Sequence, residues 1–358
     1  MMNATTALNL AQFIIPFETA TAADHPRMGG KCASLARMIA LGVPVPAGFA
    51  VATDAYAAHL HALGLEGAIK AELVGLDTND VTDKEVKSQT IRRLVTARPM
   101  PAEVEAAIRA GYAALSPSGD LPVAVRSSAT AEDMPDASFA GQQDTYLWVV
   151  GADEVVTRVR ECWGSLFTAR AMSYRADHHL GHIDVLMSVA VQTMVEARSA
   201  GVAMTLDPIN GDRTKIVIDA SWGLGESVVS GEITPDNFVV EKVLMQVQKR
   251  KIADKDHEIV ADRAARCTVT RVVDAERRTL PSLSDDEVIA VAQLARRLEK
   301  ALGGAQDVEW AIDLAGNLTA LQSRPETVWS QKKSAPQAFA LGIEGVLGTL
   351  MAPIQNKK

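Results

Sequence analysis

The segment near the end of the chain has the strictest strand periodicity. Apolar side chains alternate with polar ones over residues 307–314, and a second run over residues 318–326 follows the pair Gly316-Asn317. A period of two is typical of a strand with one buried face, and a glycine-asparagine pair between two such runs predicts a hairpin. The fold must therefore contain a sheet in which this hairpin presents one polar surface.

The register of this hairpin decides which side chains meet. A two-residue turn pairs Ala315 with Leu318 and, continued along the strands, places Glu309 opposite Arg324. A slip of one residue would turn every side chain to the opposite face. The predicted contacts therefore depend on the geometry of the turn.

In the same register Gln322 faces Ala311, while Trp310 and Leu321 point into the core. The polar surface then carries two carboxylates, one amide and one guanidinium: Asp307, Glu309, Gln322 and Arg324. Oxygen ligands of this kind suit Mg²⁺, whose shell is completed by water and phosphate oxygens. A solvated ladder of ion pairs explains the same pattern, so both interpretations stay open.

The rest of the chain mixes helix and strand signals, which predicts an α+β fold. Helices are expected over residues 31–41, much of 52–115, and 285–302, where Ser284 and Glu287 form a capping box. Strands are expected over residues 121–126, 188–195, 201–206, 215–221, 238–242 and 244–248. Residues 197–201 are expected to form a turn of small residues.

Composition excludes several classes of function. The 36 Lys and Arg against 44 Asp and Glu give a net charge of −8, which argues against a nucleic-acid surface. The 3 cysteines are far apart, so neither a disulfide framework nor a zinc site is indicated. No apolar run approaches the roughly 20 residues of a membrane helix. We expect a cytoplasmic protein that begins near Met1 and binds neither nucleic acid nor membranes.

Two segments have residues suited to phosphate. Gly29-Gly30-Lys31 stands at a helix start, where free amides, the helix dipole and a lysine attract anions. A turn with a solvated lysine is the alternative. Arg126 leaves a buried strand and enters a run of small hydroxyl residues, and its planar donors match phosphate. An ion pair with Glu132 or Asp133 is the competing interpretation.

Two further segments have the form of ligand-binding loops. Residues 192–195 end a strand and offer backbone groups to an adenine edge. An ordinary strand end that binds no ligand would have the same sequence. Residues 221–226 form a glycine turn that brings Glu226 close to a ligand. Each signal is weak in isolation.

Together these segments resemble the ATP-binding domain of the phosphoenolpyruvate synthase and pyruvate phosphate dikinase family. The matching motifs, in order, are Gly29-Gly30-Lys31-x-Ala33-Ser34-Leu35, residues 126–143, 165–175, Gln192-x-Met194-Val195, residues 220–226, Asp307-x-Glu309-Trp310 and Gln322-x-Arg324-Pro325-Glu326-Thr327. The resemblance implies an ATP-grasp-like fold with the ATP site between two lobes. The implied divisions are an N-terminal lobe over residues 1–185, a C-terminal lobe over 186–330, and a linker with a docking tail over 331–358.

The resemblance also implies roles for single residues. Lys31, Arg126 and Arg324 would hold the phosphates of ATP and act as the catalytic cations. Glu309 and Gln322 would bind Mg²⁺, or Mn²⁺ in its place, with Asp307 in support. The other implied nucleotide contacts are Thr130 and Gln142 in a loop that closes over the phosphates, Gln192, Met194 and Val195 at the adenine, and Glu226.

Members of this family continue into a domain with a Gly-Gly-x-Thr-x-His acceptor, and none of the 7 histidines here has that context. We therefore expect a separate subunit to carry the phosphohistidine and the acceptor-substrate domains. A stand-alone subunit of this kind resembles that of phenylphosphate synthase, which converts phenol, ATP and water to phenyl phosphate, AMP and phosphate.

Three other functions stay open, two of them in the same enzyme class. The ATP-binding part of a phosphoenolpyruvate synthase or of a rifampicin phosphotransferase-like enzyme would have the same residues, because none of them touches the acceptor. A regulatory subunit that senses ATP without turnover belongs to another class, and the full set of phosphate-binding cations counts against it. Residues 338–351, apolar and broken by glycines, are expected to dock on the partner subunit.

Overall fold

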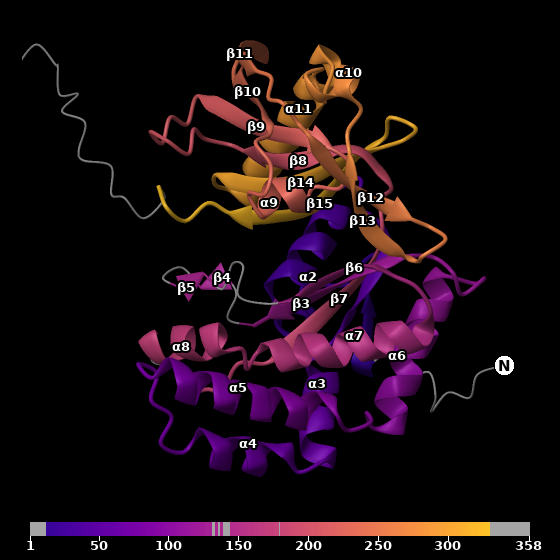
Figure 1. The fold of residues 1–358 in the computed structure, drawn as a ribbon, viewed down its shortest axis with the longest axis vertical. Coiled ribbons are helices and arrows are strands. Elements are labelled where there is room, and N and C mark those ends of the chain that lie inside the picture. The colour runs from indigo at the N-terminus through magenta and orange to yellow at the C-terminus, as the bar shows by residue number, and fades with distance from the viewer. Residues whose placement is uncertain (1–11, 131–132, 135–136, 139–143, 179, 330–358) are drawn as a thin grey trace, which may run out of the picture. The chain divides into compact units, whose positions relative to one another are not determined.

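The computed structural model describes residues 12–329 except 131–132, 135–136, 139–143 and 179 (Figure 1). Met1–Glu326 form one compact unit and Thr327–Lys358 a second. The predicted nucleotide contact Gln142 and the predicted docking tail lie outside the described residues. The elements below all belong to the first unit.

The first sheet has five antiparallel strands in the order β1-β2-β7-β3-β6. These are β1 (Ile14–Pro16), β2 (Gly48–Val51), β3 (Val123–Ala129), β6 (Thr145–Val149) and β7 (Met187–Thr193). Helices α3 (Thr53–Ala62), α6 (Ala102–Leu115) and α7 (Ala152–Ser165) contact this sheet. Farther from the strands in Figure 1, α4 (Leu65–Leu73), α5 (Val81–Thr96) and α8 (Ala169–Asp177) pack on these helices and on one another. Strands and helices share one apolar core, in which Tyr56 and Trp163 are fully buried.

The second sheet has six strands in the order β11-β10-β9-β8-β14-β15. These are β8 (Ala197–Met204), β9 (Lys215–Trp222), β10 (Asp236–Glu241), β11 (Gln246–Lys251), β14 (Gln306–Asp313) and β15 (Leu318–Pro325). Helix α11 (Asp285–Leu302) packs its apolar stripe on this sheet. The predicted capping box is confirmed, because Ser284 Oγ accepts from Glu287 N at 3.3 Å and Glu287 Oε2 accepts from Ser284 N at 2.8 Å.

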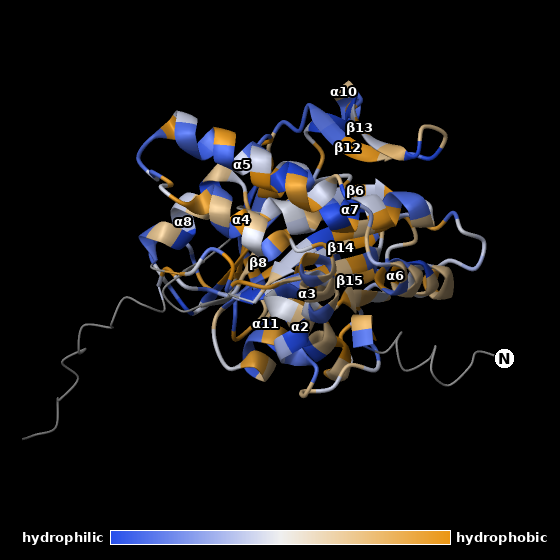
Figure 2. Cartoon of the chain, turned by 90° about the horizontal axis from the view of Figure 1, so that it is seen from below, coloured by the Kyte–Doolittle hydropathy of each residue, from blue (hydrophilic) through white to orange (hydrophobic). Residues whose placement is uncertain are grey.

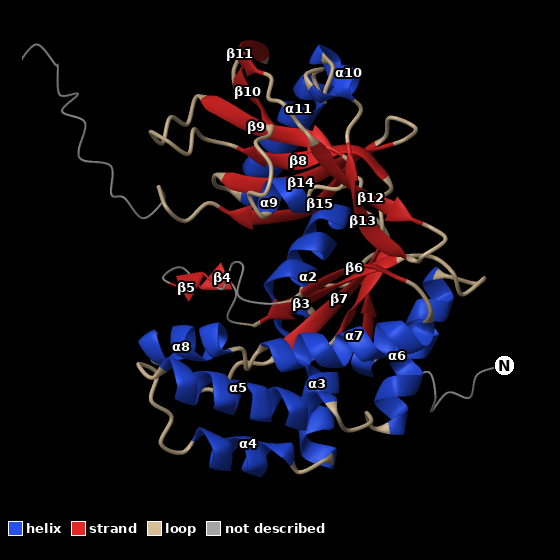
Figure 3. Cartoon of the chain, in the orientation of Figure 1, coloured by secondary structure: helices blue, strands red, loops and turns tan. Residues whose placement is uncertain are grey.

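Helix α2 (His25–Ala40) contributes to the core of the second sheet and also contacts strands of the first. Its Ser34 Oγ donates to the backbone oxygen of Ser323 at 2.6 Å. The smaller elements, visible in Figure 3, are the pairs β4 (Asp133–Met134) with β5 (Ala137–Ser138) and β12 (His257–Asp262) with β13 (Cys267–Val272), and the short helices α9 (Glu226–Val229) and α10 (Ala275–Arg278). The expected α+β fold with two lobes is confirmed.

Two sequence expectations differ from this fold. The strand expected over residues 121–126 runs on to Ala129, so the small polar residues lie in β3 rather than in a loop. Residues 197–201, expected as a turn, begin β8. Their small size serves packing within the sheet, because a Cβ on Gly201 would lie 1.9 Å from the backbone oxygen of Asp219 on the neighbouring strand.

The predicted boundary between residues 185 and 186 stays a prediction, because Met1–Glu326 form a single contact unit. The first sheet nevertheless includes β7, which begins just after that boundary.

Figure 2 shows polar and apolar residues interleaved along the helices. Within the described ranges, no helix has the length and apolar character needed to cross a bilayer.

Candidate nucleotide-binding site

The hairpin of β14 and β15 brings the four predicted polar residues to one region. Asp307 pairs with Arg324, and Glu309 pairs with Gln322. The predicted pairing of Glu309 with Arg324 is therefore wrong. Beyond Glu309 the register shifts, and Trp310 pairs with Ala320.

The turn explains the error. Ile312, and not Ala315, stands opposite Leu318, so the loop is longer than the predicted two residues. The Asp313 carboxylate closes this loop, because Oδ1 accepts from the backbone N–H of Ala315 at 2.9 Å and of Asn317 at 2.8 Å. An aspartate that satisfies loop amides in this way competes with the tight glycine turn.

The shift at the turn alone would have put the polar residues on the wrong face. A bulge at Glu309 and Trp310 inserts one unpaired residue, Leu321, and restores the alternation. Leu321 therefore does not join Trp310 in the core, as predicted, but packs near Ala311 in a small apolar cluster. The group of polar residues was predicted correctly, whereas its register was not.

Arg126 on β3 connects the first sheet to this hairpin. Its Nη2 donates to Glu309 Oε2 at 2.8 Å and to Gln322 Oε1 at 2.8 Å, and Nη1 reaches the backbone oxygen of Leu321 at 3.5 Å. The side chain is largely buried, with 15% of its surface exposed. The ion pair that the structure describes for Arg126 involves Glu309, whereas the side chains of Glu132 and Asp133 lie outside its described part, so that interpretation stays open.

The two acidic residues of the hairpin have opposite pKa shifts. Burial acts to raise the pKa of Glu309, but the Arg126 guanidinium together with the charges of Arg324 and Lys31 outweighs burial and lowers it. Burial raises the pKa of Asp307, and Arg324, whose Nε lies 3.5 Å from Asp307 Oδ2, offsets only part of that effect. The site therefore holds one carboxylate strongly in its charged form and one that accepts a proton more readily.

Lys31 contacts β3 at Ser127, the residue after Arg126, because Gly29 lets α2 approach that strand closely. Gly29 interrupts α2 with φ +67°, and a Cβ there would lie 2.1 Å from the backbone oxygen of Ser128. Only glycine combines this backbone conformation with so close an approach. The contact sets α2 against β3, where Lys31 Nζ donates to the Ser127 backbone oxygen at 2.9 Å.

A cavity of about 350 Å³ extends from Arg126 and Glu309 to the end of β7. The predicted adenine segment lines it with Gln192, Met194 and Val195, and so does Glu226 at the start of α9. Burial raises the pKa of Glu226, and the neighbouring Glu232 adds to the shift. Other apolar lining residues are Leu147, Ala197, Ala200, Leu224 and Leu321.

The backbone at the adenine segment is already partly engaged. The N–H groups of Thr193 and Met194 donate to the backbone oxygens of Ala47 at 2.9 Å and Pro122 at 3.0 Å. Thr130 lies away from the cavity, at the end of β3, where its Oγ1 accepts from Leu186 N at 3.2 Å. The structure therefore brings most of the predicted residues together and leaves Thr130 apart.

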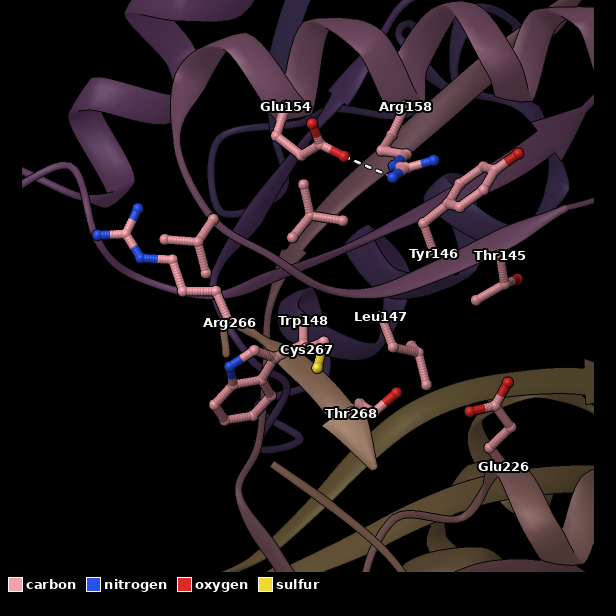
Figure 4. A pocket seen from close by; sticks show the side chains of 12 residues that line it. Thr145, Tyr146, Leu147, Trp148, Glu154, Arg158, Glu226, Arg266, Cys267 and Thr268 are labelled. Carbon is pink, nitrogen blue, oxygen red and sulfur yellow. Dashed lines mark ion pairs between the residues drawn. The ribbon is translucent and has the colours of Figure 1, made fainter. Parts of the chain in front are cut away.

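A second cavity of about 530 Å³ adjoins the first and shares Thr145, Leu147 and Glu226 with it. Figure 4 shows Arg158 and Tyr146 at one side of this cavity and Cys267 and Thr268 of β13 at another. Sequence reasoning missed Thr145 and Leu147, which line both cavities. Their alternation along β6 was the available signal, but it marks a strand and not a ligand.

Comparison with known proteins gives a sequence family described as the pyruvate phosphate dikinase AMP/ATP-binding domain, which matches residues 25–341. A probable phosphoenolpyruvate synthase of Staphylothermus marinus is 43% identical, covering 91% of this chain and 43% of that protein. The phosphoenolpyruvate synthase of Pyrococcus furiosus is 37% identical, covering 91% of this chain and 45% of that protein. The chain thus spans less than half the length of these relatives.

Among solved structures, a D-cycloserine synthetase is 12% identical, with a TM-score of 0.31 over 84% of this chain and 64% of that chain. That score is low, and the fold assignment rests on the strands and helices described above. The family match covers the second sheet with its polar hairpin and every strand of the first sheet except β1. The chain therefore belongs to the family of the pyruvate phosphate dikinase AMP/ATP-binding domain.

Proposed function

We propose that this chain is the ATP-binding part of a dikinase-type phosphotransferase of the phosphoenolpyruvate synthase kind. The observation that carries the proposal is the meeting of Arg126 with Glu309 and Gln322 beside the cavity of about 350 Å³. A guanidinium, a carboxylate and an amide oxygen at one end of an apolar cavity suit a ligand with a flat apolar ring and a charged tail. ATP is such a ligand.

The nucleotide would lie along the cavity in one direction. The apolar walls at Met194, Val195 and Leu224 would take the adenine, and Glu226 would accept from ribose hydroxyls. Lys31, Arg126 and Arg324 would then face the phosphates. Thr130 and Gln142 remain proposed contacts of the loop over the phosphates.

The donor set fits Mg²⁺, with Mn²⁺ as a substitute. Glu309, Gln322 and Asp307 offer only oxygen atoms, which hard cations prefer. In the part of the chain that the structure describes, no three His, Cys, Asp or Glu side chains gather as a complete metal site. Sparse protein ligation is usual for Mg²⁺ in nucleotide sites, where phosphate oxygens supply other ligands. Bound there, the cation would neutralise phosphate charge.

The chain's own residues perform the remaining work. Phosphoryl transfer depends chiefly on positioning and on cations that stabilise the charge of the transferred group. Lys31 is anchored on β3, Arg126 is largely buried, and Arg324 is 46% exposed at the outer edge. The first two are held by contacts to described groups, and the exposed Arg324 would be free to turn toward the phosphoryl group nearest solvent.

The acceptor lies outside these residues. A histidine on another domain or on a separate subunit would receive the phosphoryl group, in keeping with a match that covers only 43% of a relative. Pyruvate is the acceptor substrate that the names of the relatives favour. Phenol, rifampicin and ATP sensing without turnover are outcomes that the experiment distinguishes, and a cytoplasmic location belongs to the same proposal.

The test is calorimetric titration of the full chain with ATP and Mg²⁺, followed by AMP analysis after addition of the histidine-bearing polypeptide and either pyruvate or phenol. We expect ATP binding that weakens at least about tenfold in Glu309→Gln. The matched control is Glu105→Gln on α6, which pairs with Arg109 on the surface. AMP formation with phenol and not pyruvate would change the assigned substrate. Binding without AMP from any acceptor would overturn the enzymatic proposal in favour of a sensor.

A further inference from the structure

Arg126 contacts the same two side chains that the proposed function assigns to the metal ion. One nitrogen, Nη2, lies 2.8 Å from both Glu309 Oε2 and Gln322 Oε1. A guanidinium nitrogen and a divalent cation both bind oxygen lone pairs, so they compete for these atoms. The inference below rests on the proposed function.

The hydrogen bonding of Arg126 is incomplete in this arrangement. Its Nε is buried and has no hydrogen-bond partner among the described residues. A buried donor without a partner costs on the order of 1–3 kcal/mol. In this contact Glu309 Oε2 and Gln322 Oε1 each accept a hydrogen bond, whereas Arg126 Nε has no partner among the described residues.

Arg324 provides the contrast within the same site. Its side chain is 46% exposed, and it approaches Asp307 at 3.5 Å rather than Glu309 or Gln322. It carries the same charge as Arg126 and contributes to the lowered pKa of Glu309. Arg324 therefore acts on Glu309 through its charge at a distance, whereas Arg126 forms hydrogen bonds with the side-chain oxygens of Glu309 and Gln322.

We propose that Arg126 is a positioning residue that holds Glu309 and Gln322 in place before the nucleotide arrives and keeps a divalent cation from binding them alone. A nucleotide phosphate gives the guanidinium, including Nε, a better set of acceptors. Release of Glu309 and Gln322 then depends on phosphate binding. Metal affinity is thus coupled to nucleotide affinity, and the coupling is reciprocal.

The test measures Mn²⁺ binding by the full chain without nucleotide, from the loss of the free Mn²⁺ electron paramagnetic resonance signal at pH 8. For Arg126→Met we expect a dissociation constant at least about tenfold lower than that of the wild type. The gain should disappear in Arg126→Met/Glu309→Gln. The matched control Arg324→Met removes the same charge without freeing the two oxygens, and its gain should be much smaller.

An equal gain in Arg126→Met and Arg324→Met would overturn the proposal, because it would reduce the effect to charge. No gain in folded Arg126→Met would overturn it as well. If that variant fails to fold by circular dichroism, Arg126→Lys takes its place, since one ammonium cannot reproduce the planar fork. A Mn²⁺ affinity of Arg126→Lys no higher than that of the wild type would then reject the proposal.

The ATP titration separates this inference from the proposed function. Failure of the wild type to bind ATP would reject the function, while the nucleotide-free Mn²⁺ comparison would still report on competition at Glu309 and Gln322. Normal ATP binding together with unchanged Mn²⁺ affinity in Arg126→Met would reject the inference alone.

Discussion

Two ion pairs of this chain, one fully buried and one partly exposed, differ in how completely their polar atoms are satisfied. Lys255 and Asp236 are fully buried, and Asp236 also accepts from Ala253 N at 2.9 Å and from Ser282 N and Oγ at 2.7 Å each. Arg126 and Glu309 are 15% and 23% exposed, and Arg126 Nε has no partner among the described residues. In the saturated pair, Lys255 and Asp236, the polar atoms already have partners, so a ligand would add no hydrogen bond. In the incomplete pair, Arg126 and Glu309, a ligand in the cavity can supply an acceptor for Arg126 Nε.

The largest effect is expected from breaking the saturated pair. Lys255→Met would leave the Asp236 carboxylate buried without its cation, which should lower the free energy of unfolding by about 3–5 kcal/mol. Urea denaturation measures this loss. The exposed Lys249 on β11 is the control, and Lys249→Met should change stability by less than about 0.5 kcal/mol. Equal effects of the two variants would show that the buried pair is not structural.

Glu309→Gln tests the incomplete pair and should affect activity more than stability. Loss of one preorganised electrostatic group typically lowers kcat by about 10²–10³. Its cost in urea denaturation should be smaller than that of Lys255→Met, because the Arg126 side chain keeps Gln322 and some solvent contact. AMP formation and a urea curve measure the two effects. A larger loss of stability than in Lys255→Met would reverse the comparison.

The pH dependence of stability sharpens the same comparison. The folded pKa of Glu309 is lowered, so its contribution is present above its unfolded pKa of about 4.3 and is lost as pH falls through the folded value. Urea curves between about pH 3 and pH 6 should therefore show a shallower acid loss in Glu309→Gln than in the wild type.

The folded pKa of Asp307 is raised, so the sign is opposite. Its protonation favours the folded state as pH falls toward its unfolded pKa of about 3.9. Asp307→Asn should therefore make the acid loss steeper than in the wild type. Parallel changes in Asp307→Asn and Glu309→Gln would contradict the two directions.

The smallest effect is expected at an exposed pair. Arg278 donates to Asp254 with both Nε and Nη2 at 2.6 Å, and the two side chains are 34% and 57% exposed. Solvent screening limits such pairs to about 0–1 kcal/mol. Arg278→Gln should therefore leave the urea midpoint nearly unchanged. A loss comparable to that in Lys255→Met would show that burial is not what distinguishes the pairs.

The polar face of the hairpin could be predicted because alternation along a strand depends only on neighbouring residues. Its register could not, because it depends on the Asp313 carboxylate closing the loop and on the bulge at Leu321. A periodic pattern treats neighbouring residues of the loop and of the strand as equivalent. It therefore does not show where the loop closes or which residue is left unpaired at the bulge. The two errors compensate, which is why Asp307, Glu309, Gln322 and Arg324 still share one region.

The walls of the cavity were harder to predict than its charged end. Arg126 and Glu309 carry charge on strands that are otherwise largely apolar, whereas Thr145 and Leu147 look like any strand residues. Their place follows from β6 lying beside β3 in the sheet. Gln142 and the docking tail stay predictions.

The connection between β7 and β8 joins the two sheets and also lines the cavity. Every described strand of the first sheet precedes residues 194–196, and every strand of the second sheet follows them. The chain therefore crosses from sheet to sheet once within the described residues, at a segment that lines the cavity with Met194 and Val195. A purine bound there would contact the segment that joins the two sheets.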